Sequence, residues 1–351
     1  MAKGMASDID ERTEKVLRGL VDSYILTSEP VGSRTLSKSL DIALSPATIR
    51  NIMADLSELG YLKQHHTSGG RIPTDKAYRL YVDSMIVAND LPRGIQDRIR
   101  DLSLQGSAKV EDLLVSTTRI LAGLTQFVCV ISAPKAESSL LQRIEFIKIS
   151  SQKILVILIT KSGIIRNKII DSPDALSQDF LNSVAMFLNE QFHNKSLVQI
   201  RNSILEKMIE DKERYDRLLA QAVRLGKKAF EVEDSPQVFL EGQMNLLLNE
   251  KLQRRETIKS VLDAFDHQTV VMDLLESTLH ADGIQIYIGM ENHFEEFKDY
   301  SLITAGYGGD NNVLGFVGVV GPTCMDYQRI IPVVDYTAKI LSRTISERSY
   351  E

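Results

Sequence analysis

Long hydrophobic runs are missing from this sequence of 351 residues. The longest candidate, Ile154 to Ile159, is far shorter than the roughly 18 residues that cross a bilayer. The segment from Met1 to Lys15 is polar and lacks the apolar core of a secretory signal. Cysteine is also scarce, because the chain has only Cys129 and Cys324, each among apolar neighbours. Their separation excludes a disulfide framework and a cysteine-rich zinc site, so we expect a cytoplasmic protein without a membrane partner.

Signatures of catalysis and of nucleotide binding are missing as well. The sequence contains no Gly-x4-Gly-Lys-Ser/Thr pattern and no Gly-x-Gly-x-x-Gly between a strand and a helix. The glycines from Gly306 to Gly321 lie in and around expected strands, where glycine usually marks turns, bulges or close packing. None of the six histidines stands at ligand or triad spacing with a cysteine or carboxylate. We therefore predict no enzyme activity, no cofactor and no metal.

The charge of the chain is unevenly distributed. The net charge of −6 argues at first against a nucleic-acid partner. The segment from Arg34 to Arg79, however, carries seven lysines and arginines against four acidic residues, or +3, which leaves −9 for the remainder. Because charge is screened within about 8 Å at physiological salt, a locally basic segment on an acidic chain can still bind DNA.

Three helices are predicted in the first sixty residues. Asp10 to Tyr24 repeats apolar residues at helical spacing, and a break follows at Thr27 to Pro30. Ser33 is expected to cap a short second helix, and Ser45, followed by a proline, is expected to cap the third, which ends near Gly60.

The third helix has an apolar stripe that assigns its other residues to the outside. The inward residues are Ile49, Ile52, Met53, Leu56 and Leu59. The outward residues of its first half are Ala47, Thr48, Arg50 and Asn51. A recognition helix contacts base edges with its N-terminal residues, and Arg can pair with guanine and Asn with adenine. We predict that these four residues contact DNA, and that Ser33, Arg34 and Lys38 of the second helix touch backbone phosphate.

A β-hairpin is predicted directly after the third helix. Tyr61–Leu62 and the segment around Ile72 are the expected strands, with Gly69–Gly70 in the turn. Such a hairpin after a helix-turn-helix is a wing, for which we predict DNA contacts by His66, Thr67, Ser68 and Arg71. The His65–His66 pair also suggests a metal, but no carboxylate or thiol at ligand spacing supports it. Thr74 is expected to cap a fourth helix from Asp75 to Val87.

The rest of the chain alternates strands and helices after a linker at Leu91 to Gly94. The strands are expected at residues 127–131, 144–149, 154–160, 164–170, 237–248, 283–289, 300–307 and 313–320. The helices are expected at residues 95–123, 174–192, 204–230, 251–277 and 327–343. The short turns between residues 144 and 170 predict an antiparallel meander. The fold class is therefore α+β and multidomain: a winged helix-turn-helix followed by an α/β domain that a helical insertion interrupts.

Three segments carry a resemblance to a known family. Ile25–Ser37 (ILTSEPVGSRTLS), Ser45–Met85 (beginning SPATIRNIMADLSELGYL) and Gly318–Tyr336 (GVVGPTCMDYQRIIPVVDY) resemble the heat-inducible transcription repressor HrcA family. Two residues depart from the family pattern: Cys324 stands where Arg is usual and His65 where Pro is common. The resemblance implies a winged-helix DNA-binding domain at 1–90, a GAF-like domain at 91–171 plus 265–351, and an inserted dimerising domain at 172–264.

The resemblance also implies a function. A homodimer would bind the inverted-repeat operator of the groE and dnaK chaperone operons and repress their transcription. Heat would inactivate the repressor, and the GroEL/GroES chaperonin would maintain its active form. The alternative is a regulator whose GAF-like domain binds a ligand, which a ligand that raises the melting temperature would reveal. An enzyme with a DNA-binding appendage is a third hypothesis, which lacks a catalytic constellation.

Overall fold

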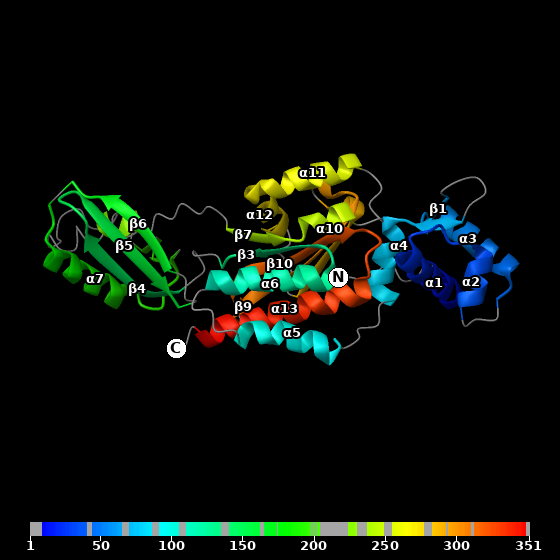
Figure 1. Ribbon diagram of the computed structural model, residues 1–351, viewed down its shortest axis with the longest axis horizontal. Coiled ribbons are helices and arrows are strands. Elements are labelled where there is room, and N and C mark those ends of the chain that lie inside the picture. The colour runs from blue at the N-terminus through cyan, green and yellow to red at the C-terminus, as the bar shows by residue number, and fades with distance from the viewer. Residues whose placement is uncertain are drawn as a thin grey trace.

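The computed structural model places three groups of elements in a row (Figure 1). It describes residues 9–40, 44–64, 70–85, 91–104, 110–134, 140–161, 165–173, 175–197, 199–200, 202–203, 224–229, 237–248, 255–276, 283–292, 294–309 and 312–348. The N-terminal winged helix lies at one end, a five-stranded sheet with its helices lies in the middle, and a smaller three-stranded sheet lies at the other end (Figure 1). Over the described residues, none of the helices has the length and apolar character to span a membrane.

The winged helix follows the order expected from the sequence. Its elements are α1 (Glu11–Thr27), α2 (Ser33–Ser39), α3 (Pro46–Glu58), β1 (Leu62–Gln64), β2 (Arg71–Pro73), α4 (Asp75–Leu80) and a π-helical turn at Tyr81–Met85. The hydroxyl of Ser45 accepts a hydrogen bond of 3.1 Å from the N–H of Thr48, and Pro46 occupies the first helical position. Strands β1 and β2 pair antiparallel. The predicted Ser-Pro start of α3 and the predicted hairpin are therefore confirmed.

Two local predictions in this domain are wrong, and a third is confirmed only in part. Ser33 does not cap α2, because Gly32 is the N-cap and Ser33 is already the first helical residue. Leu59 does not belong to the buried stripe, because it lies beyond the end of α3 and is 43% exposed. Thr74 is the N-cap residue of α4 as expected, but its hydroxyl donates to the carbonyls of Gly60 and Tyr61 and makes no side-chain capping bond.

The middle group is an antiparallel sheet between two layers of helices. The strand order is β7 (Val238–Glu241), β3 (Val128–Ser132), β10 (Asn312–Pro322), β9 (Tyr300–Gly309) and β8 (Ile284–Ile288). One layer contains α5 (Arg93–Leu104), α6 (Val110–Thr125) and α13 (Tyr327–Arg348), and the other contains α10 (Gln243–Leu248), α11 (Arg255–Asp266) and α12 (Gln268–Glu276) (Figure 1). Successive residues of β9 face opposite layers, since Leu302 and Ile303 belong to different clusters.

Several expected elements of this group are subdivided in the structure. The linker is shorter than predicted, because α5 already begins at Arg93. The single helix expected at 95–123 is two helices, α5 and α6, and the one expected at 251–277 is α11 and α12. The strand expected at 237–248 ends at Glu241, where Gly242 adopts φ +90° and α10 begins. Most of the helix expected at 204–230 lies outside the described residues.

The remaining group is the predicted meander with its own core. Strands β4 (Leu141–Lys148), β5 (Lys153–Thr160) and β6 (Ile165–Asp171) form an antiparallel sheet that α7 (Gln178–Phe192) covers on one face. Its buried cluster runs from Leu141 to Ala229 and includes no residue of the five-stranded sheet. The boundaries expected at 172 and 264 do not match this division. The first separates β6 from α7. The second assigns β7, α10 and most of α11 to the insertion, although β7 is a strand of the central sheet and the two helices pack on that sheet.

Gly70 is held at a point of close backbone contact. A Cβ there would lie 2.5 Å from the carbonyl carbon and oxygen of Val31. Arg71, the residue after Gly70, exchanges two backbone hydrogen bonds of 2.9 Å with Val31. These bonds join β2 to the loop before α2. We expect Gly70→Ala to lower the free energy of unfolding by about 1–3 kcal/mol, because backbone atoms must move apart. Urea denaturation measures this change.

Gly123→Ala is the matched control. Gly123 lies in α6 and has open space where a Cβ would be. Alanine there is expected to raise stability by about 0.5–1 kcal/mol, because glycine inside a helix is entropically unfavourable. Equal denaturation midpoints for Gly70→Ala and the unmodified protein would show that the wing strand tolerates displacement from Val31.

Candidate nucleic-acid interface

Helix α3 separates an apolar face from a polar one. Ile49, Ile52, Met53 and Leu56 are buried in the core of the winged helix. Ala47, Arg50 and Asn51 are exposed, and Thr48 is half-buried. The predicted exposure of Arg50 and Asn51 is therefore confirmed, while their contacts with DNA stay a prediction. The acidic residues of the helix, Asp55 and Glu58, are exposed too, but they lie in its second half.

The start of α3 is held in a fixed geometry. The hydroxyls of Ser45 and Thr48 lie 2.9 Å apart and share a hydrogen bond, in addition to the capping bond to the Thr48 N–H. The Thr48 side chain therefore has a partner within the protein and can offer DNA its methyl group and its remaining hydroxyl capacity. This arrangement fixes the backbone that carries Arg50 and Asn51, the two side chains able to pair with base edges in two hydrogen bonds.

The three residues of α2 that were predicted to contact phosphate differ in their exposure. Arg34 and Lys38 are exposed on its surface. Ser33 is buried, with only 9% of its surface accessible. Its hydroxyl is therefore much less available to phosphate than the two cationic side chains.

The described part of the wing consists of its two strands, up to Gln64 before the tip and from Gly70 after it. Arg71 is half-buried on β2, and its backbone is bonded to Val31. The other predicted wing residues, His66, Thr67 and Ser68, lie outside the described residues, as does the His65–His66 pair considered for a metal. Where residues are described, no group of three or more histidine, cysteine or acidic side chains is arranged to hold a metal ion.

One cation near the wing did not enter the sequence prediction. Lys63 on β1 is exposed and leads into the tip. The sequence could have predicted this exposure, because alternate residues of a strand face opposite sides and the neighbouring Leu62 is apolar and faces inward. Lys76 is differently placed: it donates to the Leu59 carbonyl at 2.9 Å and lies 4.3 Å from the centre of the Tyr61 ring. Its ammonium group thus holds the end of α3 to the start of the wing.

Comparison with known proteins matches both parts of the chain to one family. Residues 8–85 match the family model described as "Winged helix-turn-helix transcription repressor, HrcA DNA-binding". Residues 111–331 match the model described as "HrcA protein C terminal domain".

Full-length relatives agree with these matches. The chain is 39% identical over 339 residues to the heat-inducible transcription repressor HrcA of Geobacter sulfurreducens, covering 97% of this chain and 99% of the relative. It is 37% identical over 343 residues to the protein of that name from Syntrophobacter fumaroxidans, with coverage of 97% and 99%. A crystal structure of a hypothetical protein has the same fold, with a TM-score of 0.62, 24% identity and coverage of 97% and 99%.

Proposed function

The chain belongs to the HrcA family of heat-inducible transcription repressors, and from this membership we propose that it represses chaperone operons of the groE and dnaK class by binding an inverted-repeat operator as a homodimer. The family is one of transcription repressors with a winged-helix DNA-binding domain, not of enzymes. Because the ligand is chromosomal DNA, we place the protein in the bacterial cytoplasm.

One observation carries the DNA-binding proposal. The first half of α3 exposes Arg50 and Asn51 while the opposite face of the same helix is buried in the domain core. A helix anchored in this way can enter a major groove without loss of its packing. Arg34, Lys38 and Arg71 supply cations on the neighbouring elements, where phosphate contacts set the register on the duplex.

The second copy of the chain is proposed to dock on the three-stranded sheet. The face opposite α7 carries Leu155, Ile157 and Ile159 on the central strand β5. Beside them, Ile165 and Ile169 of β6 are 64% and 57% exposed. An isologous contact through such a face gives the two-fold symmetry that an inverted repeat requires. We propose that this unit is the dimerising domain of the family and that the five-stranded domain is its GAF-like domain.

The β4 edge of the same sheet is protected against strand addition. On β4, the side-chain amide of Asn189 pairs with the N–H and the carbonyl of Ile144 at 2.8 and 3.0 Å. The amide of Gln178 bridges the Phe146 carbonyl and the Lys148 N–H at 2.8 and 2.9 Å. Because these amides occupy edge hydrogen-bonding groups of β4, they oppose a dimer formed by strand addition at the β4 edge.

Heat sensitivity follows from marginal stability. A domain loses binding competence when a few kcal/mol of stability disappear on heating. We propose that the GroEL/GroES chaperonin restores the active form, so that scarcity of free chaperonin relieves repression.

Footprinting on the chaperone promoters of the source organism tests the proposed function. We expect protection of an inverted repeat, loss of protection after heating, and recovery when GroEL, GroES and ATP are added. A protein that protects no such element would contradict the operator assignment. Protection that never recovers with chaperonin would contradict the chaperonin step alone.

Arg71 provides a separate test of the wing. Arg71→Ala is expected to weaken binding to all DNA sequences alike and to reduce the slope of log affinity against log salt by about one. Alanine keeps the backbone bonds to Val31, so the hairpin remains in place. Arg98→Ala removes the same charge from an exposed position on α5 and should leave the slope unchanged. A loss confined to certain sequences would mean that Arg71 contacts bases.

A further inference from the structure

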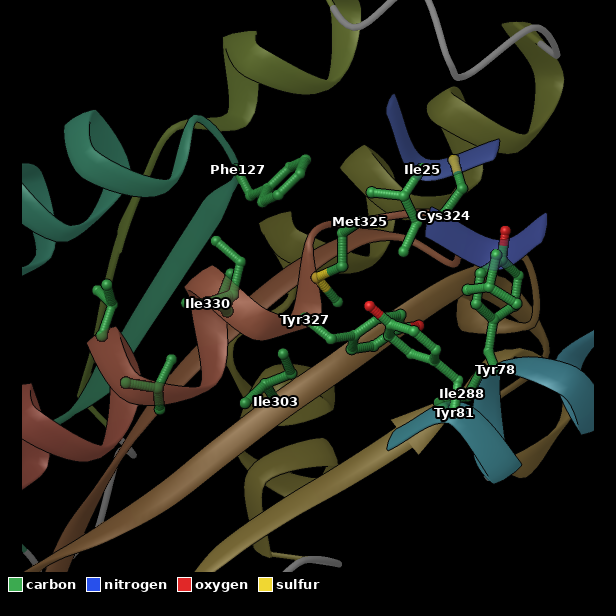
Figure 2. Close-up of a cluster of buried hydrophobic side chains, with 14 of the residues drawn as sticks. Ile25, Tyr78, Tyr81, Phe127, Ile288, Ile303, Cys324, Met325, Tyr327 and Ile330 are labelled. Carbon is green, nitrogen blue, oxygen red and sulfur yellow. The ribbon is translucent and has the colours of Figure 1, made fainter. Parts of the chain in front are cut away.

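The winged helix packs directly against the central domain. Its core and one layer of the central domain form a single apolar cluster. At their junction the rings of Tyr78 on α4 and Tyr327 on α13 lie 6.0 Å apart, centre to centre, and both are buried. Ile25, Cys324 and Met325 surround them (Figure 2). Domains joined by a large apolar interface move little relative to each other. Cys324, at the position where Arg is usual, is thus part of a buried junction.

A guanidinium fork bridges the two domains at the edge of this junction. Arg79 of α4 donates to both carboxylate oxygens of Glu291, from Nε at 2.9 Å and from a terminal nitrogen at 2.5 Å. The same terminal nitrogen donates to the Ile286 carbonyl on β8 at 2.5 Å, and the other donates to Asp83 at 3.1 Å. The hydrogen bonds to Glu291 raise the pKa of Arg79. We call Arg79, Glu291 and the Ile286 carbonyl the clamp.

A second contact shapes the turn that carries Glu291. The N–H of Met290 donates to a carboxylate oxygen of Asp75, the first residue of α4, at 3.0 Å. Gly289 has φ +55°, and a Cβ there would collide with the Asp75 carboxylate. Glu291 itself accepts from the Ile288 N–H at 2.9 Å. The turn is therefore fitted to α4 by backbone conformation as well as by charge.

The π-helical turn that continues α4 also contacts both domains. The hydroxyl of Tyr81 donates to Asp22 of α1 at 2.5 Å and accepts from Gln328 of α13 at 2.8 Å. The contacts of α4 and of the turn after it together restrict rotation of the winged helix against the central domain. Because a bidentate Arg–carboxylate pair has a fixed planar geometry, the clamp adds a directional constraint to the apolar contacts that hold the domain.

We propose that Arg79 and Glu291 are positioning residues that set the separation of the two recognition helices, and so determine which spacer length between operator half-sites the repressor accepts. This inference rests on the proposed binding of an inverted repeat by a homodimer. Two linked DNA-binding modules gain avidity only when both can reach their half-sites at once. A released winged helix could reach half-sites over a range of spacings.

Operators of different spacing test the inference. Affinities are measured for inverted repeats whose spacer changes in single base pairs over one helical turn of about 10.5 base pairs, and for one isolated half-site. We expect the unmodified protein to bind its best spacing about 100-fold more tightly than the worst. Arg79→Ala should reduce this ratio below about tenfold, while its affinity for the isolated half-site stays unchanged.

Two further variants separate orientation from charge and from folding. Arg79→Lys keeps the charge but cannot form the fork, so it should relax the spacing preference as Arg79→Ala does. Arg343→Ala breaks an exposed pair with Glu347 on α13, away from the junction, and should keep the full preference.

The possible outcomes are distinguishable. The inference is overturned if Arg79→Ala and Arg79→Lys retain the spacing preference, or if the unmodified protein binds all spacings equally. Failure of the unmodified protein to bind any repeat would instead contradict the proposed function. Unchanged half-site affinity in each variant reports that the winged helix is folded.

Discussion

Asn51→Ala is expected to lower operator affinity about 5- to 150-fold, which corresponds to the roughly 1–3 kcal/mol of a bidentate contact between a side chain and a base. Asn51 is exposed in the first half of α3, and asparagine pairs with adenine through two hydrogen bonds. Alanine is a better helix former than asparagine, so the loss cannot come from a weaker helix. The preference at one operator position should relax at the same time. Gel-shift titration on operators with single base changes measures both effects.

Arg50→Ala should behave in the same way at a different operator position, because arginine pairs with guanine. Glu58→Ala is the matched control on the same helix: Glu58 is exposed near the end of α3, and removal of its negative charge should not lower affinity. Unchanged affinity in Asn51→Ala and Arg50→Ala would refute their assignment as base-contacting residues. A loss that is equal for all base changes would assign them to phosphate.

The winged helix could be predicted from sequence because its signals are local. Ser45 and Pro46 mark the start of α3, and the apolar spacing of Ile49 to Leu56 fixes which face is buried. The same spacing leaves Arg50 and Asn51 outside without any knowledge of tertiary structure. Where the local signal was ambiguous, the prediction was wrong, as for Ser33, since both glycine and serine are accepted at an N-cap.

The division of the remaining chain could not be predicted in this way. The meander was predicted correctly, because consecutive strands with short turns pair with each other. Its separation from the central sheet depends on long-range pairing: β3 lies between β7 and β10, which follow it by more than a hundred residues. The alternation of apolar and polar residues along a strand is the same whichever sheet the strand joins, so it cannot tell which strands pair. The contact between Arg79 and Glu291 spans 212 residues and leaves no sequence pattern.

The outer face of the three-stranded sheet is the surface proposed above for contact between two copies of the chain. Ile157 occupies the centre of this face, opposite Glu145 on β4 and Asn167 on β6. It is half-buried within one chain, so a lysine there can keep its ammonium group in water and leave the fold of the monomer intact. In a dimer that buries the face, the same ammonium group would lose its hydration without a partner.

Ile157→Lys is therefore expected to yield monomers and to reduce operator affinity by about 100-fold or more, because a single winged helix loses the avidity of two linked modules. Analytical ultracentrifugation measures the first effect and gel-shift titration the second, with circular dichroism as the check on folding. Met186→Lys adds the same charge to an exposed residue of α7, which covers the opposite face of the sheet, and should leave both dimer and affinity unchanged. A stable dimer of Ile157→Lys with full operator affinity would mean that the two copies meet through another surface.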